Sequence, residues 1–248
     1  NTEAVAAIPT NLTEVEYKSV EDVLKKAGMN TVHLVPQPIA AALGSRLAID
    51  EPTAYLVVDI GGGVTNVAII SMNGLVVSQR VKIGGSRLND DIVKFVREEF
   101  KLVIGEPTAE EIKIAVGAAA TPVEKLEIAA RGQDLSTGLP KEVIIKDSLV
   151  RAAFGRSLRE LISAIHETIE ITPPELVGDI YRNGLYLCGG GSLLRGIDEL
   201  IQKELSVTVH RVEDPLTCVV RGTGVIVENI KKHSNLLYDL TRLKPINA

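Results

Sequence analysis

Apolar residues recur along the chain with two different periods, and this alternation predicts a mixed α/β fold. Short β-branched runs bounded by glycine, proline or asparagine are typical of strands, whereas apolar positions three and four residues apart are typical of helices. The predicted strands cover 3–9, 31–36, 54–60, 65–72, 75–83, 124–135, 141–147 and 207–212. The predicted helices cover 13–28, 37–49, 84–100, 107–120, 148–171, 173–184 and 214–232, and 185–205 is predicted as strand, glycine turn and helix. A strand meander followed by strand–helix units places the chain in the α/β class.

Local signals define some of these elements more closely. Thr13 and Glu16 have the spacing of a capping box, and Gly28 follows two lysines at the end of the same helix. The dipeptide Asn73-Gly74 is a two-residue hairpin signal between two predicted strands. The first helix is expected to bury an apolar stripe made of Val15, Val20, Val23, Leu24 and Ala27.

Composition and charge narrow the function classes. The chain has 248 residues and a net charge of −5, with the two signs interspersed. Nucleic acid is not an expected partner, because neutralising a phosphate backbone requires a basic stripe. Cys188 and Cys218 lie in apolar settings and are predicted to be buried reduced thiols, with a disulfide as the less favoured alternative. No apolar run reaches the roughly 18 residues that span a bilayer and no signal peptide opens the chain, so a cytoplasmic location is expected.

The stretch VVDIGGGVTNVAII, residues 57–70, carries the first candidate chemistry. Gly61, Gly62 and Gly63 lack Cβ, so they can adopt positive φ and let backbone N–H groups converge on an anion. Thr65 adds a hydroxyl that could reach a terminal phosphate, and Asp59 suits a divalent cation lying between its carboxylate and a phosphate. A strand follows the glycines, which fits neither a Walker loop nor a dinucleotide fingerprint, because both continue into a helix. A tight hairpin without a ligand is the alternative.

A second glycine loop occurs in LYLCGGGSLLRGI, residues 185–197. Gly189, Gly190 and Gly191 follow an apolar strand, and a helix is expected to open at Ser192. Small residues before a helix N-terminus suit an anion or the close approach of a flat ligand, although a plain strand–helix turn capped by Ser192 is the alternative. Two such loops in one α/β chain suggest a nucleotide held between them.

These patterns resemble the superfamily of actin, Hsp70 and sugar kinases. Within it, VVDIGGGVTNVAIISMNGLVVS, GEPTAEEIK and EDPLTCVVRGTG resemble the MreB family of bacterial actin homologues, in order and over nearly the whole chain. The resemblance implies an actin-like ATPase fold (ribonuclease H-like) with two lobes around an ATP cleft. It also implies filaments beneath the cytoplasmic membrane that organise cell-wall growth, with filament protomers, the membrane surface and cell-wall elongation proteins such as RodZ as partners.

The resemblance also implies roles for individual residues. The first glycine loop, with Asp59 and Thr65, corresponds to a phosphate loop that works with ATP and Mg²⁺, and the second loop flanks the adenosine. Glu110 and Lys113 in AEEIK approach the base and ribose, although a Glu and a Lys three apart on a helix are usually a solvated pair. Gln37 stands where the family has Glu, and it is expected to orient the attacking water by hydrogen bonds. An amide that only caps the following helix is the alternative.

The chain departs from the family pattern in ways that weaken the catalytic expectation. Gln37 replaces the usual Glu, Val64 stands where a Thr is common, and the family's first phosphate loop and its early membrane-inserting segment do not occur in these residues. The expected organisation is an incomplete first lobe made of 1–50 with a C-terminal helix over 214–248, a second region made of 51–84 and 147–213, and a third over 85–146. Weak or absent ATP turnover is expected of this chain by itself. Another actin-superfamily scaffold, of the FtsA or pilus-assembly type, or an Hsp70-like ATPase is the alternative.

Overall fold

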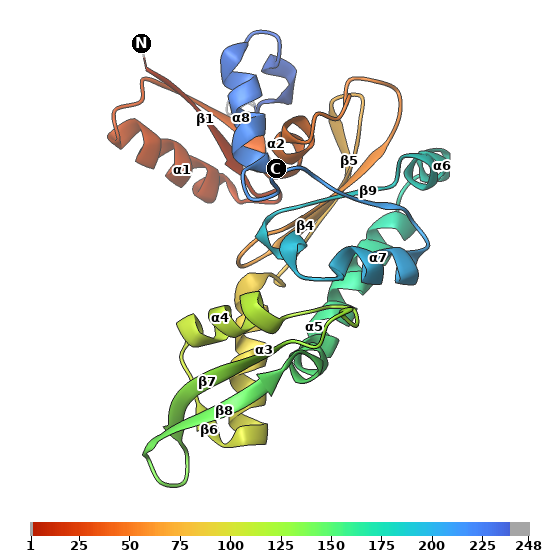
Figure 1. Ribbon diagram of the computed structural model, residues 1–248. Coiled ribbons are helices and arrows are strands. Elements are labelled where there is room, and N and C mark those ends of the chain that lie inside the picture. The colour runs from red at the N-terminus through yellow and green to blue at the C-terminus, as the bar shows by residue number, and fades with distance from the viewer. Residues whose placement is uncertain (1, 239–248) are drawn as a thin grey trace, which may run out of the picture.

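The computed structural model describes residues 2–238, which form three sheets and the helices that cover them. Figure 1 shows a two-stranded sheet with α1, α2 and α8 at one end, a five-stranded sheet in the middle, and a three-stranded sheet with α3 and α4 at the other end. The strands are β1 (Glu3–Ile8), β2 (Thr31–Pro36), β3 (Tyr55–Ile60), β4 (Thr65–Ser71), β5 (Gly74–Val81), β6 (Leu102–Val103), β7 (Glu127–Asp134), β8 (Pro140–Lys146), β9 (Leu185–Cys188) and β10 (Val209–Arg211). The helices are α1 (Glu14–Lys26), α2 (Gln37–Gly44), α3 (Gly85–Phe100), α4 (Glu106–Val116), α5 (Asp147–Glu170), α6 (Pro174–Asn183), α7 (Ile197–Leu205) and α8 (Cys218–Glu228), with 3₁₀ turns η1 (Gly190–Leu193) and η2 (Ser234–Leu236).

The five-stranded sheet has the order β10-β9-β3-β4-β5 and lies between two hydrophobic cores. Strand β3 runs parallel to β9 and antiparallel to β4. Because side chains alternate along a strand, Leu56, Val58 and Ile60 enter the core that α3 and α5 cover, whereas Val57 enters the core that α2 and α8 cover. Burial on both faces explains why β3 and β4 appear in the sequence as unbroken apolar runs.

The capping box predicted at the start of α1 is confirmed. The backbone N–H of Glu16 donates to Thr13 Oγ1 at 3.3 Å, and the backbone N–H of Thr13 donates to Glu16 Oε2 at 2.7 Å. These two bonds satisfy donors that have no partner inside the helix, so the chain enters α1 at a defined residue.

The predicted apolar stripe of α1 is wrong in part. The side chains of Val15 and Val23 are 76% and 65% exposed, whereas Tyr17 is buried. The helix packs through Tyr17, Val20 and Leu24, which are spaced three and four residues apart and meet the core formed with β1 and β2. Tyr17 therefore defines the packed face, and Val15, Val23 and Ala27 of the predicted stripe are exposed.

The hairpin between β4 and β5 turns one residue earlier than the sequence predicts. Met72 and Asn73 have φ values of 48° and 64°, and Ser71 pairs with Gly74. A tight hairpin turn of this kind needs positive φ at both central residues, and Asn73 is well suited to one of them. Gly74 is therefore the first residue of β5.

Helices α2 and α8 approach each other closely through glycine. A Cβ added to Gly222 would lie 1.8 Å from the carbonyl oxygen of Ala40, and one added to Gly44 would lie 1.8 Å from the carbonyl oxygen of Cys218. No side chain fits at these two points, so helix packing explains Gly222, the first glycine of the RGTG stretch in α8.

The long C-terminal helix predicted over 214–248 is shorter in the structure. Helix α8 ends at Glu228, because the chain turns at 229–233 before η2. The part of the prediction that concerns residues 239–248 lies outside the described residues.

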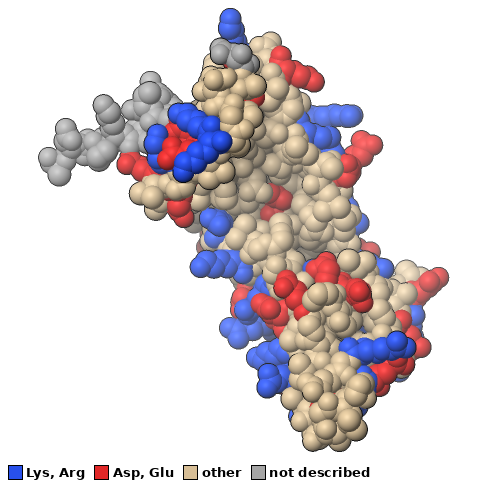
Figure 2. All heavy atoms as spheres, turned by 90° about the vertical axis from the view of Figure 1, so that its left-hand side faces the viewer, with Lys and Arg blue, Asp and Glu red and all other residues tan. Residues whose placement is uncertain are grey.

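The distribution of surface charge and the state of the cysteines agree with what the sequence predicts. Figure 2 shows acidic and basic side chains mixed along one whole face of the molecule. Within residues 2–238, no helix has the length and apolar character needed to cross a membrane. Cys188 and Cys218 are free and buried, as predicted.

Candidate functional site

The two glycine loops meet because the strands that precede them are neighbours. Strands β3 and β9 are parallel, and Asp59 near the end of β3 pairs with Cys188 at the end of β9. The carboxyl ends of parallel strands lie at the same edge of a sheet, which is where α/β proteins bind ligands. The loops that begin at Gly61 and Gly189 therefore leave this edge side by side.

The glycines of the second loop are required by close packing. Gly189 has a φ of 79°, and a Cβ there would lie 2.4 Å from Asp59 Oδ1 and 2.4 Å from the carbonyl oxygen of Ile60. A Cβ on Gly191 would lie 2.2 Å from Ile60 Cγ2. Only residues without a side chain let this loop rest on the end of β3.

The glycines of the first loop serve a different purpose. None of Gly61, Gly62 and Gly63 has a positive φ, so the left-handed conformation considered from the sequence is not used there. A Cβ on Gly62 or Gly63 would meet no atom within 4 Å. These residues leave open space beside the backbone, where another group can approach it.

The first loop is fastened to the start of α3. The backbone N–H of Gly85 donates to the carbonyl of Gly61 at 3.0 Å, and that of Ser86 donates to the carbonyl of Gly62 at 2.7 Å. A Cβ on Gly84 would lie 2.6 Å from the Gly61 oxygen, so a fourth glycine permits this contact. The N-terminus of α3, with its partial positive charge, is thereby held next to the loop.

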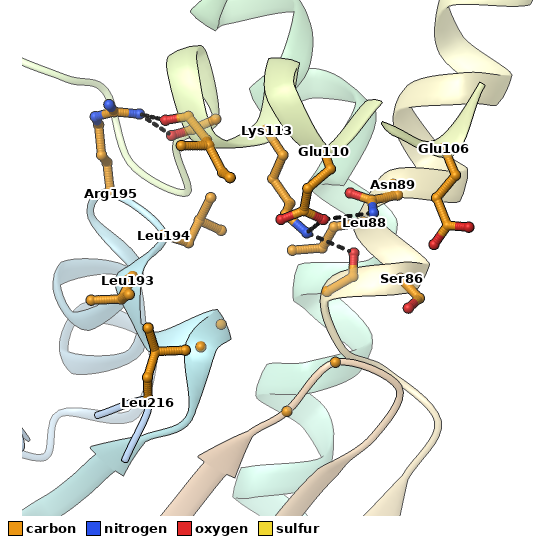
Figure 3. A pocket seen from close by; sticks show the side chains of 17 residues that line it. Ser86, Leu88, Asn89, Glu106, Glu110, Lys113, Leu193, Leu194, Arg195 and Leu216 are labelled. Atoms are coloured by element: carbon orange, nitrogen blue, oxygen red, sulfur yellow. Dashed lines mark hydrogen bonds and ion pairs between the residues drawn. The ribbon is translucent and has the colours of Figure 1, made fainter. Parts of the chain in front are cut away.

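A cavity of about 510 Å³ lies between these loops and helices α3 and α4. Figure 3 shows Leu193, Leu194 and Leu216 on one side and Asn89, Glu110 and Lys113 on the other. The lining residues are Gly61, Gly62, Gly85, Ser86, Leu88, Asn89, Glu106, Glu110, Lys113, Ile114, Gly117, Gly190, Gly191, Leu193, Leu194, Arg195 and Leu216. One end of the cavity is polar, and the other is formed by aliphatic side chains.

A hydrogen-bonded group of three side chains forms the polar wall. Glu110 Oε2 accepts from Lys113 Nζ at 2.7 Å and from Asn89 Nδ2 at 2.8 Å, and Lys113 Nζ also donates to the carbonyl of Gly85 at 3.0 Å. The bond from Lys113 is the main reason why the pKa of Glu110 lies below its usual value. Because Oε2 receives both donors, Oε1 is left to accept from a ligand. The Asn89 side chain is 3% exposed, and its Oδ1 has no hydrogen-bond partner among the described residues.

Asp59 lies beneath the loops, buried at the end of β3 with 2% of its surface exposed. Burial raises the pKa of its carboxyl, and the hydrogen bond from Gln37 opposes that shift. Gln37 Nε2 donates to Asp59 Oδ2 at 2.7 Å, so the start of α2 contacts β3 directly under the glycines. The neighbouring Asn66 amide is also buried, and neither its Nδ2 nor its Oδ1 has a hydrogen-bond partner among the described residues. The buried Asp59 carboxylate uses Oδ2 to accept from Gln37 and is the group at this place that could contribute an oxygen ligand to a cation.

The structure brings half of the predicted site residues to the cavity wall. Gly61, Gly62, Glu110, Lys113, Gly190 and Gly191 line the cavity, whereas Gln37, Asp59, Gly63, Thr65, Gly189 and Ser192 do not.

Two of the residues outside the wall have other hydrogen-bond partners. Thr65 is fully buried, and its hydroxyl donates to the carbonyl of Ile83 at 2.7 Å. No α-helix opens at Ser192, contrary to expectation, because η1 occupies this position and α7 begins at Ile197. The Ser192 hydroxyl donates to the carbonyl of Gly189 at 2.7 Å and closes the turn.

The sequence analysis did not identify several residues that line the cavity. Asn89 and Ser86 lie at the start of α3, and Arg195 and Leu216 lie in irregular segments near the second loop. The glycine pair at 84–85 was the one available signal, because it marks a close backbone contact before a helix. Within the described residues, no group of three or more His, Cys, Asp or Glu side chains is arranged to hold a metal ion.

Comparison with known proteins gives a consistent result. A model of the MreB/Mbl protein family matches residues 1–235. The chain is 41% identical over 234 residues to the cell shape-determining protein MreB of Escherichia coli K12, covering 94% of this chain and 67% of that protein. It is 40% identical over 224 residues to Mbl of Bacillus subtilis 168, covering 90% of this chain and 67% of that protein. The crystal structure of MreB5 of Spiroplasma citri bound to ADP matches with a TM-score of 0.92 and 36% identity, covering 94% of this chain and 71% of that one.

The structural similarity to MreB5 covers 94% of this chain and therefore includes all three sheets, so it defines the class of protein. The fold is actin-like. Within that class, the chain belongs to the MreB/Mbl family. The resemblance stated from the sequence is thereby confirmed.

Proposed function

We propose that the protein is an ATP-binding cytoskeletal protein that assembles into filaments at the cytoplasmic membrane and organises cell-wall synthesis to set rod shape. The observation that carries the proposal is the cavity between two glycine loops that leave neighbouring parallel strands. The ADP in the related MreB5 structure and the cell shape-determining role in the names of the two relatives support it.

Different parts of the cavity suit the three parts of a nucleotide: phosphate, sugar and base. The open backbone at Gly62, beside the start of α3, suits phosphate. Glu110 has a free carboxylate oxygen that can accept from a sugar hydroxyl. Ile114, Leu193 and Leu216 expose 65%, 48% and 68% of their surface at the aliphatic end. Apolar side chains this exposed need a cover, and the flat face of a base provides one.

Asp59 and Gln37 suit a magnesium nucleotide. Mg²⁺ is usually held by one or two carboxylates together with waters and substrate phosphates, so a single buried carboxylate fits its needs. When bound, the ion would offset the negative charge of the phosphates. Gln37 uses its Nε2 on Asp59, which leaves its amide oxygen to accept a hydrogen bond from water. A Gln in this place orients water but is a weak base, so we expect slow ATP hydrolysis.

Assembly and partners complete the proposal. Identical head-to-tail contacts without rotational closure produce open filaments of protomers. We propose one lobe made of 1–50 and 214–248 and another made of 51–84 and 147–213 with the region 85–146, hinged across the nucleotide. The further proposed partners are the cytoplasmic membrane surface and cell-wall elongation proteins such as RodZ.

The decisive experiment measures nucleotide binding and sedimentation together. We expect the purified protein to bind Mg-ATP and to pellet at high speed with Mg-ATP but not with buffer alone. A Glu110→Ala variant should bind about 10- to 100-fold more weakly, because a hydrogen bond to a charged group contributes roughly 1.5–3 kcal/mol.

The matched control is Glu111→Ala, one position along the same helix on an exposed side chain that does not line the cavity. This variant should bind like the unsubstituted protein. No saturable ATP binding by the unsubstituted protein, or pelleting that ignores nucleotide, would refute the proposal.

A further inference from the structure

Arg195 links the two walls of the cavity at its aliphatic end. It follows the second glycine loop and precedes α7. Its Nη1 donates to the carbonyls of Ile114 at 2.9 Å and Gly117 at 3.3 Å, both at the far end of α4 (Figure 3). The contact therefore joins residues about 80 positions apart in the sequence.

The guanidinium of Arg195 acts as a cap for α4. The last four carbonyls of a helix have no partner within it, and Ile114 contributes one of them. A cation placed there also favours the negative end of the helix dipole. The backbone N–H of Gly117 closes the helix on Lys113, so Arg195 supplies the bond that Ile114 lacks.

A backbone contact strengthens the same connection. The N–H of Ala119 donates to the carbonyl of Arg195 at 2.7 Å, and Ala118 pairs with Arg195 as a parallel bridge. A Cβ on Gly196 would lie 2.6 Å from Ala120 Cβ. The segment after α4 thus rests directly on the segment before α7.

This connection joins the two segments that carry aliphatic residues of the cavity wall. Leu193 and Leu194 precede Arg195 in the chain, and Ile114 belongs to the helix end that Arg195 caps. The glycine loops and the start of α3 are held by other bonds, from Gly85 and Ser86 to the first loop. Different residues therefore join α4 to the two ends of the cavity: Arg195 at the aliphatic end and Lys113, through the carbonyl of Gly85, at the phosphate end.

We propose that Arg195 is a positioning residue for the nucleoside: by capping α4 from the second glycine loop, it holds the aliphatic walls at the separation that grips the base and sugar. Arg195 leaves the phosphate end unaffected. This inference rests on the nucleotide binding proposed above.

The test compares two ligands across three variants of the intact protein. Affinities for Mg-ADP and for Mg-pyrophosphate are measured with unsubstituted protein, Arg195→Ala, Arg195→Lys and Arg211→Ala. Arg211 is the matched control, because it pairs with Asp198 of α7 at 2.9 Å and does not line the cavity. Arg195→Ala should weaken Mg-ADP binding about tenfold and change pyrophosphate binding less than about twofold. Arg195→Lys, which keeps the cation, should restore most of the loss.

Each other result has a definite meaning. If Arg195→Ala binds Mg-ADP as Arg211→Ala does, or loses both ligands equally, the inference is wrong. If the unsubstituted protein binds no Mg-ADP, the proposed function fails and the inference fails with it. Should Arg195→Ala not fold, Arg195→Met, which keeps an unbranched apolar side chain and removes every donor, decides by the same comparison.

Discussion

Gly62 and Gly189 show how two glycines in matching loops meet opposite constraints. Gly189 has a φ of 79° and touches Asp59 and Ile60, whereas Gly62 has open space around it. We expect Gly189→Ala to lower the free energy of unfolding by on the order of 2–3 kcal/mol, because it combines left-handed strain with overlap. Gly62→Ala should change that free energy by less than about 0.5 kcal/mol.

Thermal unfolding and ATP binding of both variants check this prediction. Gly62→Ala should keep its unfolding temperature and still bind ATP more weakly, because a methyl group would stand where the phosphates approach the backbone. Equal unfolding temperatures for the two variants would contradict the contacts described at Gly189.

Asp59 is predicted to reduce stability at neutral pH. Burial raises the pKa of its carboxyl in the folded state, so the folded chain holds the proton more tightly than the unfolded chain does. Between the unfolded pKa, about 3.8, and the raised folded pKa, stability therefore falls as pH rises. Asp59→Asn removes this loss, and we expect the variant to be more stable than the unsubstituted protein at pH 7 without nucleotide.

Urea unfolding at pH 3.5 and pH 7 tests the sign. The gain from Asp59→Asn should shrink strongly at pH 3.5, because the carboxyl is then mostly protonated in both the folded and the unfolded state. The control is Asp50→Asn, at an exposed aspartate. A gain of the same size at both pH values would show that ionisation of Asp59 is not its cause. The variant should also lose Mg-ATP binding. That result would indicate that Asp59 is retained for nucleotide binding although it lowers the stability of the fold.

Within helix α8, two glycines two residues apart should respond in opposite directions. A Cβ on Gly222 would lie 1.8 Å from the Ala40 carbonyl oxygen, whereas one on Gly224 would meet nothing within 4 Å. Gly222→Ala should cost about 1–3 kcal/mol by forcing α2 and α8 apart. Gly224→Ala should stabilise the helix by up to about 1 kcal/mol, because alanine has the higher helix propensity. Urea midpoints measure both, and a stable Gly222→Ala would mean that the helices are not in contact there.

The order and type of the main elements could be predicted because local patterns determine them. The capping box at Thr13, the apolar runs of β3 and β4 and the glycines at helix ends all act within a few residues. The predictions were wrong where the structure of a segment depends on contacts with residues distant in the sequence. Val15 and Val23 are apolar, yet Tyr17 decides which face of α1 packs on β2. Strand β6 has two residues and exists only through pairing with β7, so it has no pattern of its own.

The candidate site could also be predicted in part, where local sequence patterns or the family resemblance point to its residues. Gly61, Gly62, Gly190 and Gly191 could be found as loops, and the family resemblance added Glu110 and Lys113. Arg195 could not be found from the sequence, because its importance depends on carbonyls of α4 about 80 residues earlier. Single arginines in loops are common, and no local spacing distinguishes this one.

At the scale of the molecule, the cavity is made by segments that lie far apart in the sequence. Its wall combines the turn after β3, the start of α3, the helix α4, the turn η1 and Leu216 before α8. Direct bonds fasten Arg195, which follows η1, to α4, and others fasten the first loop to α3. Leu216 reaches the cavity from the segment before α8, the helix that packs on α2. A ligand that touches all of them would couple both ends of the molecule seen in Figure 1.

Amide hydrogen exchange can detect this coupling in unassembled protein. With saturating Mg-ADP at a concentration below filament assembly, we expect slower exchange at 61–64, 113–119 and 190–195, because a bound ligand must leave before these segments open. A ligand at 100 times its Kd slows such opening by about 100-fold. The turn at 135–139 between β7 and β8 is the internal reference, since none of its residues lines the cavity. Slowing confined to 61–64 would mean that only the phosphates are gripped, and the segments would then move independently even with ligand bound.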